Sequence, residues 1–162
     1  MIWDAVVVGG GPAGSATAAR LARDGWRILL LDRASFPRRK PCGECVNPAG
    51  VDALRRLGVL DAVLACNPAP LDGWRIAAGD DAGFVGRFPA GVRGLGIPRE
   101  RLDAILLEHA RICGAEVRTG VKVTDLLRDA GRHVRGVKAG GEEIAAHGAL
   151  RIPANLPRER GP

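Results

Sequence analysis

Tyrosine is absent from this chain of 162 residues, and only three tryptophans and three phenylalanines occur, although the 46% hydrophobic content is ordinary for a packed core. No apolar run approaches the roughly 20 residues that a membrane-spanning helix needs, so we expect no membrane span. The first residues carry no basic region, and Asp4 interrupts their apolar run, which argues against a secretory signal peptide. We therefore expect a cytoplasmic protein whose four cysteines are thiols, namely Cys42, Cys45, Cys66 and Cys113.

A concentrated patch of positive charge is also missing, although 24 lysines and arginines outnumber 18 acidic residues and give a net charge of +6. A nucleic-acid-binding protein gathers such charges on one face or stripe, whereas here they are scattered. We therefore expect no nucleic-acid partner. The one compact basic run is Arg38-Arg39-Lys40, and a role for it near an anionic cofactor or substrate stays open.

The histidines do not form a metal-binding pattern. His133 and His147 have no acidic or sulfur partner at metal-ligand spacing, so we predict no metal site. No acid, base or nucleophile occupies a position that assigns it a catalytic role.

The chain does contain a glycine-rich loop between an apolar strand and a helix, followed by a second strand that ends in an acid. These parts are residues 4–8, 9–14, 13–24 and 27–31 with Asp32. The loop fits G-x-G-x-x-G: Gly9 permits a tight turn, Gly11 lets the backbone approach a pyrophosphate, and Gly14 lets helix and strand pack closely. The helix N-terminus offers N–H groups and a positive dipole end to phosphates, and Asp32 lies where a carboxylate accepts hydrogen bonds from ribose hydroxyls. The sequence therefore predicts a dinucleotide site.

Helical and strand patterns continue to alternate along the chain, which is typical of an α/β domain. The patterns predict helices over 47–57, 60–66 and 99–113, and a β-hairpin over 74–88. They also predict strands over 116–118 and 121–123, with a break near Gly120, and over 126–127 and 134–139. From His147 the pattern fails. We therefore expect one Rossmann-like domain over residues 1–146 and an irregular, disordered tail over residues 147–162.

Three segments make residues 2 to about 146 resemble the N-terminal part of FAD-dependent oxidoreductases that include the geranylgeranyl reductases and the aromatic-hydroxylase-type monooxygenases. The Pro-Cys-Gly at 41–43 is similar to one in the geranylgeranyl reductase branch, and Arg99 heads an Arg-x-x-Leu-Asp helix. The resemblance implies a three-layer, glutathione-reductase-type FAD/NAD(P)-binding domain with a small β-hairpin excursion. The segments are Asp4–Arg33, Phe36–Gly58 and Pro98–Val123.

The same resemblance implies a set of cofactor-binding positions. The glycine-rich loop would hold the FAD pyrophosphate, Asp32 the adenosine ribose, and the backbone of Val123 would face the adenine. Arg99 would lie near the flavin and pyrophosphate, with Cys42 and Gly43 towards the isoalloxazine. NAD(P)H would be the electron donor and a small molecule the substrate. The full set is Gly9, Gly11, Pro12, Ala13, Gly14, Asp32, Arg33, Cys42, Gly43, Arg99 and Val123.

The chain departs from this family in its length. Family members carry a second FAD motif built around Gly-Asp and a substrate domain on a separate sheet, and neither occurs here. Family-like sequence breaks off into HGALRIPANLPRERGP from His147. We therefore expect a truncated or frameshifted product, or a fragment, whose independent catalysis is doubtful and whose site a partner chain could complete.

Two alternatives stay open beside this prediction. The Cys42-Gly43-Glu44-Cys45 segment is a C-x-x-C, which would suit a flavin disulfide oxidoreductase, although that family usually places four residues between its cysteines. The chain could also be a non-catalytic dinucleotide-binding module or remnant. At such a site Asp32 would disfavour NADP, because a carboxylate repels a 2′-phosphate.

Overall fold

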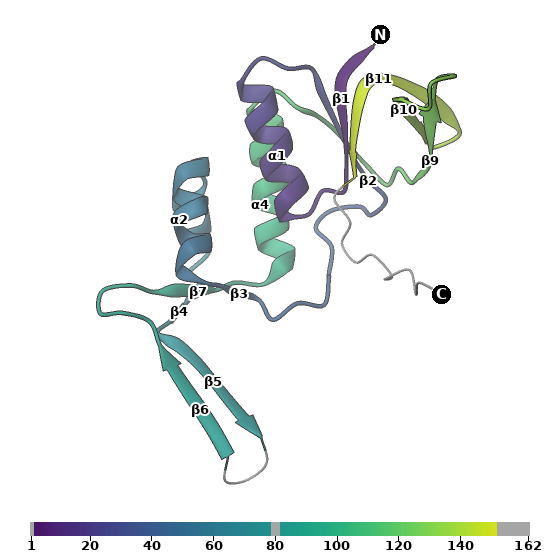
Figure 1. Ribbon diagram of the computed structural model, residues 1–162. Helices are drawn as coiled ribbons and strands as arrows, with labels where there is room; N and C mark the ends of the chain where they lie inside the picture. Colours follow the sequence, from purple (N-terminus) through teal and green to yellow (C-terminus); the bar gives the residue numbers. More distant parts are fainter. Residues whose placement is uncertain (1, 79–81, 152–162) are drawn as a thin grey trace. The chain divides into compact units, whose positions relative to one another are not determined.

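The computed structural model describes residues 2–78 and 82–151. The chain divides into two compact units, and Figure 1 labels most of their elements. The first unit consists of Met1–Arg38 with Leu106–Pro162, and the second of Arg39–Ile105. Helix α4 (Arg99–Ile112) begins in the second unit and ends in the first. No helix in the described residues is long and apolar enough to cross a membrane.

The first unit is built on a six-stranded sheet in the order β8-β2-β1-β11-β10-β9. The neighbours among β8, β2, β1 and β11 run parallel, and β11, β10 and β9 form an antiparallel meander. This parallel central sheet in a mixed α/β unit confirms the predicted fold class. The strands are β1 (Trp3–Val8), β2 (Ile28–Asp32), β8 (Glu116–Thr119), β9 (Val123–Arg128), β10 (Val134–Ala139) and β11 (Glu142–Arg151).

Strand β11 belongs to both parts of this sheet. Near its start Ile144 lies opposite Val137 of β10, and from Ala146 onward the strand runs parallel to β1. Strand β11 therefore extends to Arg151, five residues beyond the expected boundary at 146. Residues 147–151 form a strand although their sequence shows no apolar period. Their backbone pairs with β1, and a hydrogen-bonded ladder needs no particular side chains. Residues 152–162 of the expected tail lie outside the described residues.

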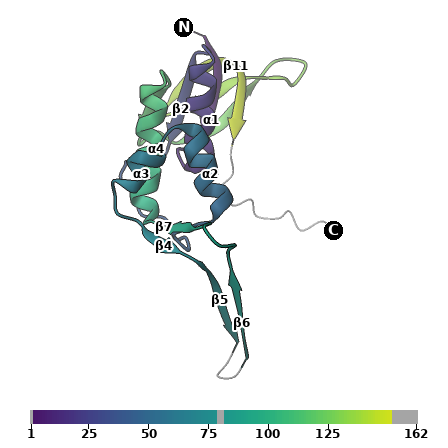
Figure 2. The same cartoon turned by 90° about the vertical axis from the view of Figure 1, so that its left-hand side faces the viewer.

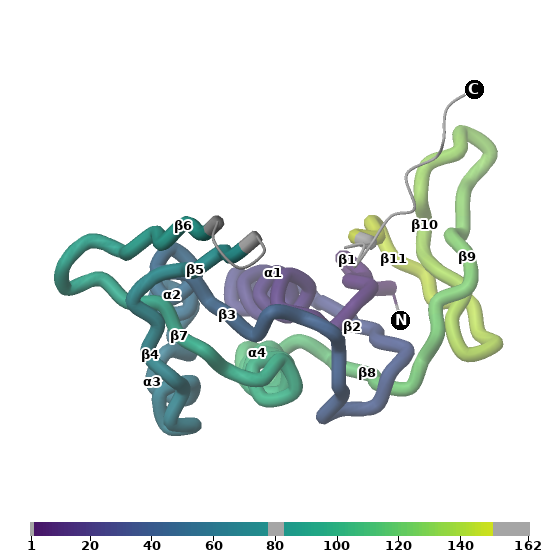
Figure 3. The backbone as a smooth tube through the Cα atoms, turned by 90° about the horizontal axis from the view of Figure 1, so that it is seen from below, coloured from purple at the N-terminus to yellow at the C-terminus, as the bar shows by residue number. Residues whose placement is uncertain are grey.

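Both faces of the parallel strands are covered. Val6, Leu29 and Leu31 pack in one buried cluster with residues of the meander. On the other face lies helix α1 (Pro12–Arg23), whose Ala18 and Ala19 are buried. Figure 3 shows the helix and the meander on opposite sides of β1 and β2. Strand β2 is consequently buried along its whole length, as expected for a strand covered on both faces.

The second unit combines short helices with two small sheets, seen in Figure 2. The predicted hairpin is confirmed as β5 (Gly73–Ala78) and β6 (Ala82–Arg87), and residues 79–81 of its turn lie outside the described residues. Asn47 caps α2 as predicted, because its side chain accepts a hydrogen bond from the Gly50 N–H. The remaining elements are β3 (Cys45–Val46), α2 (Pro48–Leu57), α3 (Leu60–Leu64), β4 (Ala69–Leu71) and β7 (Gly94–Gly96).

Candidate functional site

The loop between β1 and α1 has a backbone that favours glycine at one position and requires it at another. Gly9 has φ of +111°, in the left-handed region, and its N–H donates to the carbonyl of Leu31 over 2.8 Å. A Cβ atom on Gly14 would lie 1.8 Å from the carbonyl oxygen of Gly9, so no side chain fits there. These two residues therefore have the geometry expected of the motif, with a tight turn and a close helix–strand approach.

Helix α1 presents an uncapped N-terminus at this loop. Gly11 is the N-cap residue and makes no side-chain capping bond, Pro12 follows at the start of the helix, and the first turn contains no acidic residue. The first N–H groups of a helix have no partner within the helix, and here these include Ala13 and Gly14. The positive end of the helix dipole is thus available to an anionic group such as a pyrophosphate.

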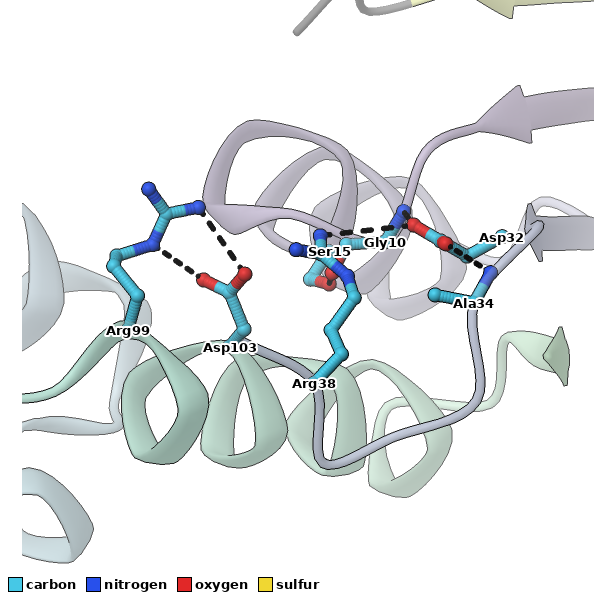
Figure 4. Close-up of polar contacts among 7 residues, drawn as sticks. All are labelled: Gly10, Ser15, Asp32, Ala34, Arg38, Arg99 and Asp103. Atoms are coloured by element: carbon cyan, nitrogen blue, oxygen red, sulfur yellow. Dashed lines mark hydrogen bonds and ion pairs between the residues drawn. The ribbon is translucent and has the colours of Figure 1, made fainter. Parts of the chain in front are cut away.

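Asp32 holds the loop from the end of β2, as Figure 4 shows. Its side chain is buried, and its Oδ2 accepts a hydrogen bond from the N–H of Gly10 over 2.7 Å. Its Oδ1 accepts from the N–H of Ala34 over 2.8 Å. A carboxylate has about four acceptor positions, so these backbone bonds leave acceptor capacity for a ribose hydroxyl. Asp32 therefore organises the loop as well as offering the acid expected from the sequence.

Two further side chains of the first unit join this arrangement. The hydroxyl of Ser15 is buried and donates to the Gly10 carbonyl over 3.2 Å. The Arg38 guanidinium lies 3.8 Å from Asp32 Oδ2 and 4.8 Å from the centre of the Phe36 ring. The compact basic run had singled out Arg38, whereas nothing in the sequence distinguished Ser15 from an ordinary helix residue.

Arg33 and Val123 are the two remaining predicted positions of the first unit. Arg33 follows Asp32 directly and is exposed. Val123 begins β9 and packs, partly buried, against the core cluster. The segment before it is tied to the end of β2, because the N–H of Val121 donates to the Asp32 carbonyl over 2.9 Å. Ligands of open α/β sheets bind at such carboxyl ends of parallel strands.

The second unit contains an ion pair at the start of α4. Nε of Arg99 donates to Asp103 Oδ1 over 2.8 Å, and its terminal nitrogen donates to Oδ2 over 3.1 Å (Figure 4). Asp103 is fully buried and the Arg99 side chain is only 15% exposed. Hydrogen bonds to Asp103 raise the pKa of Arg99, so the guanidinium stays charged. The spacing of four residues on one helix is the signal that sequence reasoning could have used to find this pair.

Cys42 lies beside this guanidinium. A hydrogen bond with the Arg99 side chain, and next a backbone hydrogen bond at Glu44, lower the pKa of the Cys42 thiol. Cys42 and Gly43 are exposed, and a Cβ on Gly43 would meet no atom within 4 Å. The second unit thus brings together two of the predicted positions, Cys42 and Arg99, in one polar cluster. In the described residues, no group of three or more His, Cys, Asp or Glu residues is arranged to hold a metal ion.

The residues of the first unit fit the diphosphate and ribose of a dinucleotide. Gly14 leaves no space for a side chain, α1 lacks an acid in its first turn, and Asp32 fixes the loop from a buried position. Comparison with known proteins agrees with this geometry, because residues 3–147 match a family model described as an FAD binding domain.

Curated relatives include two bacterial reductases. Menaquinone reductase of Mycolicibacterium smegmatis is 38% identical over 138 residues, which cover 83% of this chain and 33% of that protein. Geranylgeranyl diphosphate reductase of Rhodobacter capsulatus is 36% identical over 162 residues, which cover 96% of this chain and 38% of that protein. The chain therefore spans only 33% to 38% of the length of these relatives.

Solved structures show the same fold. A myxobacterial FAD-dependent chondrochloren halogenase has a TM-score of 0.85 at 29% identity, over 97% of this chain and 38% of that one. A geranylgeranyl bacteriochlorophyll reductase-like protein of Thermoplasma acidophilum has a TM-score of 0.78 at 22% identity, over 93% of this chain and 38% of that one, and so shares the fold. Since the family model covers most of the chain and the loop has the matching geometry, this chain belongs to the FAD-binding-domain family of oxidoreductases.

Proposed function

We propose that the chain is the FAD-binding part of an NAD(P)H-dependent oxidoreductase that resembles the geranylgeranyl reductases and acts on a small molecule. The observation that carries the proposal is the loop of residues 9–14. There Gly14 excludes any side chain, and α1 begins without a cap. The buried carboxylate of Asp32 bonds directly to this loop. These features support binding of the pyrophosphate and adenosine ribose of FAD.

The residues of the loop divide the binding between them. The N–H groups of Ala13 and Gly14 donate to the pyrophosphate, and Gly11 and Pro12 direct the backbone into the first turn of α1. Asp32 accepts hydrogen bonds from the ribose hydroxyls with the acceptor capacity that its backbone bonds leave.

The family resemblance extends the proposal to further positions. Arg33 would border the ribose beside Asp32, and the backbone of Val123 would face the adenine. In the second unit Arg99 would bind near the flavin, with Cys42 and Gly43 on the isoalloxazine side. Bound FAD supplies the redox chemistry in such enzymes, while the protein binds, orients and tunes it.

Reduction is the form of this chemistry that we propose. Its support is the Pro-Cys-Gly at 41–43, together with relatives of 38% and 36% identity whose names describe reductases. Other members of the family named among the relatives are monooxygenases, such as the 6-methylpretetramide 4-monooxygenase of Streptomyces rimosus at 36% identity.

Titration of the purified chain with flavins tests the proposal. FAD should bind, with a change in flavin absorbance and fluorescence, and ADP should displace it because ADP carries the pyrophosphate and adenosine. FMN, which lacks the adenosine half, should bind much more weakly. If FAD binds, anaerobic addition of NADH or NADPH then tests for bleaching of the flavin absorbance.

A different pattern of binding would favour the non-catalytic alternative. A chain that binds NAD⁺ and ADP but ignores FAD would be a nucleotide-binding module, and the FAD proposal would be abandoned. A chain that binds FAD without any NAD(P)H-dependent bleaching would keep the cofactor assignment and remove the electron donor from the proposal for this chain.

A further inference from the structure

The C-x-x-C of residues 42–45 contains a second cysteine, Cys45, to which the proposed flavin site assigns no role. Its two cysteines are both exposed, whereas Cys66 and Cys113 are partly buried. Arg99, which the buried Asp103 holds, lies beside Cys42 and favours its thiolate. The partly buried Cys113 also has an arginine beside it, because Arg23 donates to its sulfur over 3.5 Å, but no second cysteine lies within a few positions of it in the sequence. The C-x-x-C pair therefore combines one thiol suited to attack with a second thiol three positions away.

We propose that Cys42 and Cys45 form a reversible oxidation site, in which Cys42 reacts with a hydroperoxide and Cys45 then closes a disulfide. This inference goes beyond the proposed function and does not rest on it, because it requires neither bound flavin nor NAD(P)H. The oxidant that it names is hydrogen peroxide or an organic hydroperoxide.

The chemistry balances over two steps. The Cys42 thiolate attacks one oxygen of the hydroperoxide, the O–O bond breaks, and the alkoxide or hydroxide that leaves takes a proton from water. Cys42 is then a sulfenic acid. The Cys45 sulfur attacks the Cys42 sulfur, the S–O bond breaks, and water leaves with the Cys45 proton. Two thiols have then lost two electrons, and the hydroperoxide has gained them.

The backbone gives the two cysteines different roles. Cys45 begins β3, where it pairs with Gly96, and the N–H of Ile97 donates to the Glu44 carbonyl over 2.9 Å, so this end is anchored. The Cys45 thiol donates to the Gly43 carbonyl over 2.8 Å, which places its sulfur against the intervening backbone. Cys42 lies outside any regular element, and Gly43 borders open space. Cys42 can therefore move to meet the geometry that a disulfide demands.

Mass spectrometry of the full-length chain tests the disulfide. After limited treatment with hydrogen peroxide and alkylation under denaturing conditions, the tryptic peptide of residues 40–55, which contains both cysteines, should be lighter by two hydrogen atoms and unalkylated. Dithiothreitol should restore both thiols. Cys66 lies in a separate peptide and serves as the internal control, which should be alkylated throughout. In Cys45→Ser, Cys42 should instead stop at the sulfenic acid and react with dimedone.

The proposal is overturned if both cysteines of this peptide remain thiols while Cys66 or Cys113 oxidises. It is equally overturned if Cys42 passes to the sulfinic acid at the same rate in the wild type and in Cys45→Ser, because Cys45 would then not resolve it.

The part played by Arg99 is that of a positioning residue, and a pH profile isolates it. The rate of Cys42 alkylation by iodoacetamide should follow thiolate formation with a midpoint below the ordinary value of a cysteine thiol. Arg99→Gln should move the midpoint upward and slow alkylation at neutral pH by about tenfold for each unit of pKa regained.

Two further variants control for effects on the fold. Arg99→Lys, which keeps the charge, should recover part of the shift in midpoint even where Arg99→Gln weakens the fold. Arg101→Gln, at an exposed position of the same helix, is the matched control. Equal midpoints in Arg99→Gln and Arg101→Gln would overturn this role.

Discussion

Gly14 lies where helix α1 approaches the loop before it most closely. A methyl group at this position would lie 1.8 Å from the Gly9 carbonyl oxygen, and that oxygen belongs to a backbone already held by a hydrogen bond to β2. Rotation of a side chain cannot relieve such a clash. The position therefore couples the stability of the first unit to the shape of its glycine-rich loop.

Gly14→Ala should consequently lower both stability and FAD affinity. Overpacking of this kind costs about 2 kcal/mol, so urea unfolding should show a loss of that size, and FAD titration should show weaker binding or none. Gly148→Ala is the matched control, because a Cβ there would meet no atom within 4 Å. Equal free energies of unfolding for the two variants would contradict this account of the loop.

Asp32 offers a second test at a single residue. Asp32→Asn replaces one carboxylate oxygen by an amide group, which cannot accept from the N–H that now faces it. Leaving one buried donor unsatisfied costs about 1–3 kcal/mol, and we expect a loss in that range in urea unfolding together with weaker FAD binding. Asp125→Asn, at an exposed position of β9, should change neither quantity. A fully stable Asp32→Asn variant would show that the two backbone bonds do not hold the loop.

Some residues of the candidate site could be predicted from the sequence and others could not, for a physical reason. Gly9, Gly14 and Asp32 could be predicted because their roles depend on local backbone geometry and on spacing along the chain. Ser15 could not, because its hydrogen bond to the Gly10 carbonyl depends on the packing of one helical turn against the loop. Arg99 was predicted from resemblance alone, and its bidentate bond to Asp103 is a finding of the structure.

Strands β1 and β2 are joined at their starts by one side chain. The carboxylate of Asp4 accepts a hydrogen bond from the N–H of Arg27 over 2.7 Å, and the Arg27 Nε lies 3.6 Å away. The backbone hydrogen bond first, and then the charge of Arg27, lower the pKa of Asp4. A depressed folded-state pKa stabilises the fold above the unfolded value, and this contribution is lost as pH falls through the folded value.

Asp4→Asn should therefore be less stable than the wild type at neutral pH and equally stable in acid. The amide oxygen keeps the hydrogen bond to Arg27 and removes the charge, so the variant isolates the titration. Urea unfolding of both proteins should give a constant difference above about pH 5 that shrinks below about pH 4. A difference that persists unchanged in acid would mean that the carboxylate charge contributes nothing.

Elements with a clear period could be predicted, and very short strands could not. Helix α2 carries its start and stop signals in Asn47 and Gly58, and the hairpin of β5 and β6 carries an alternating pattern. Strands β3, β4 and β7 have only two or three residues each, too few for any period to emerge. The last part of β11 was missed because backbone pairing with β1 defines it, and that pairing joins opposite ends of the chain.

At the scale of the whole molecule, the hairpin carries an apolar face with no strand partner in the described residues. Ile76 lies opposite Phe84, and Trp74 lies on the same face opposite Gly86. The three large side chains are exposed by 64%, 65% and 46% respectively. An exposed cluster of this kind favours association, and an isolated two-stranded ribbon is marginally stable in water.

We therefore expect the purified chain to self-associate as its concentration rises. The double variant Ile76→Lys with Phe84→Lys should stay at the monomer mass of 17.0 kDa in sedimentation velocity over the same range. Val85→Lys changes a residue that is also more than half exposed, on the opposite face of the hairpin, and is the matched control. A wild-type chain that remains monomeric at every concentration would disprove this expectation.

The topology of the sheet in the first unit also determines the order in which its strands can pair during folding. Its meander joins strands that follow one another along the chain, whereas its parallel half closes only when Ala146 pairs with Trp3. Contacts between such distant positions form slowly, because the intervening chain must first be confined. During synthesis, β1 can therefore pair with β11 only after almost all of the described chain has left the ribosome. Until then, one hydrogen-bonding edge of β1 has no strand partner.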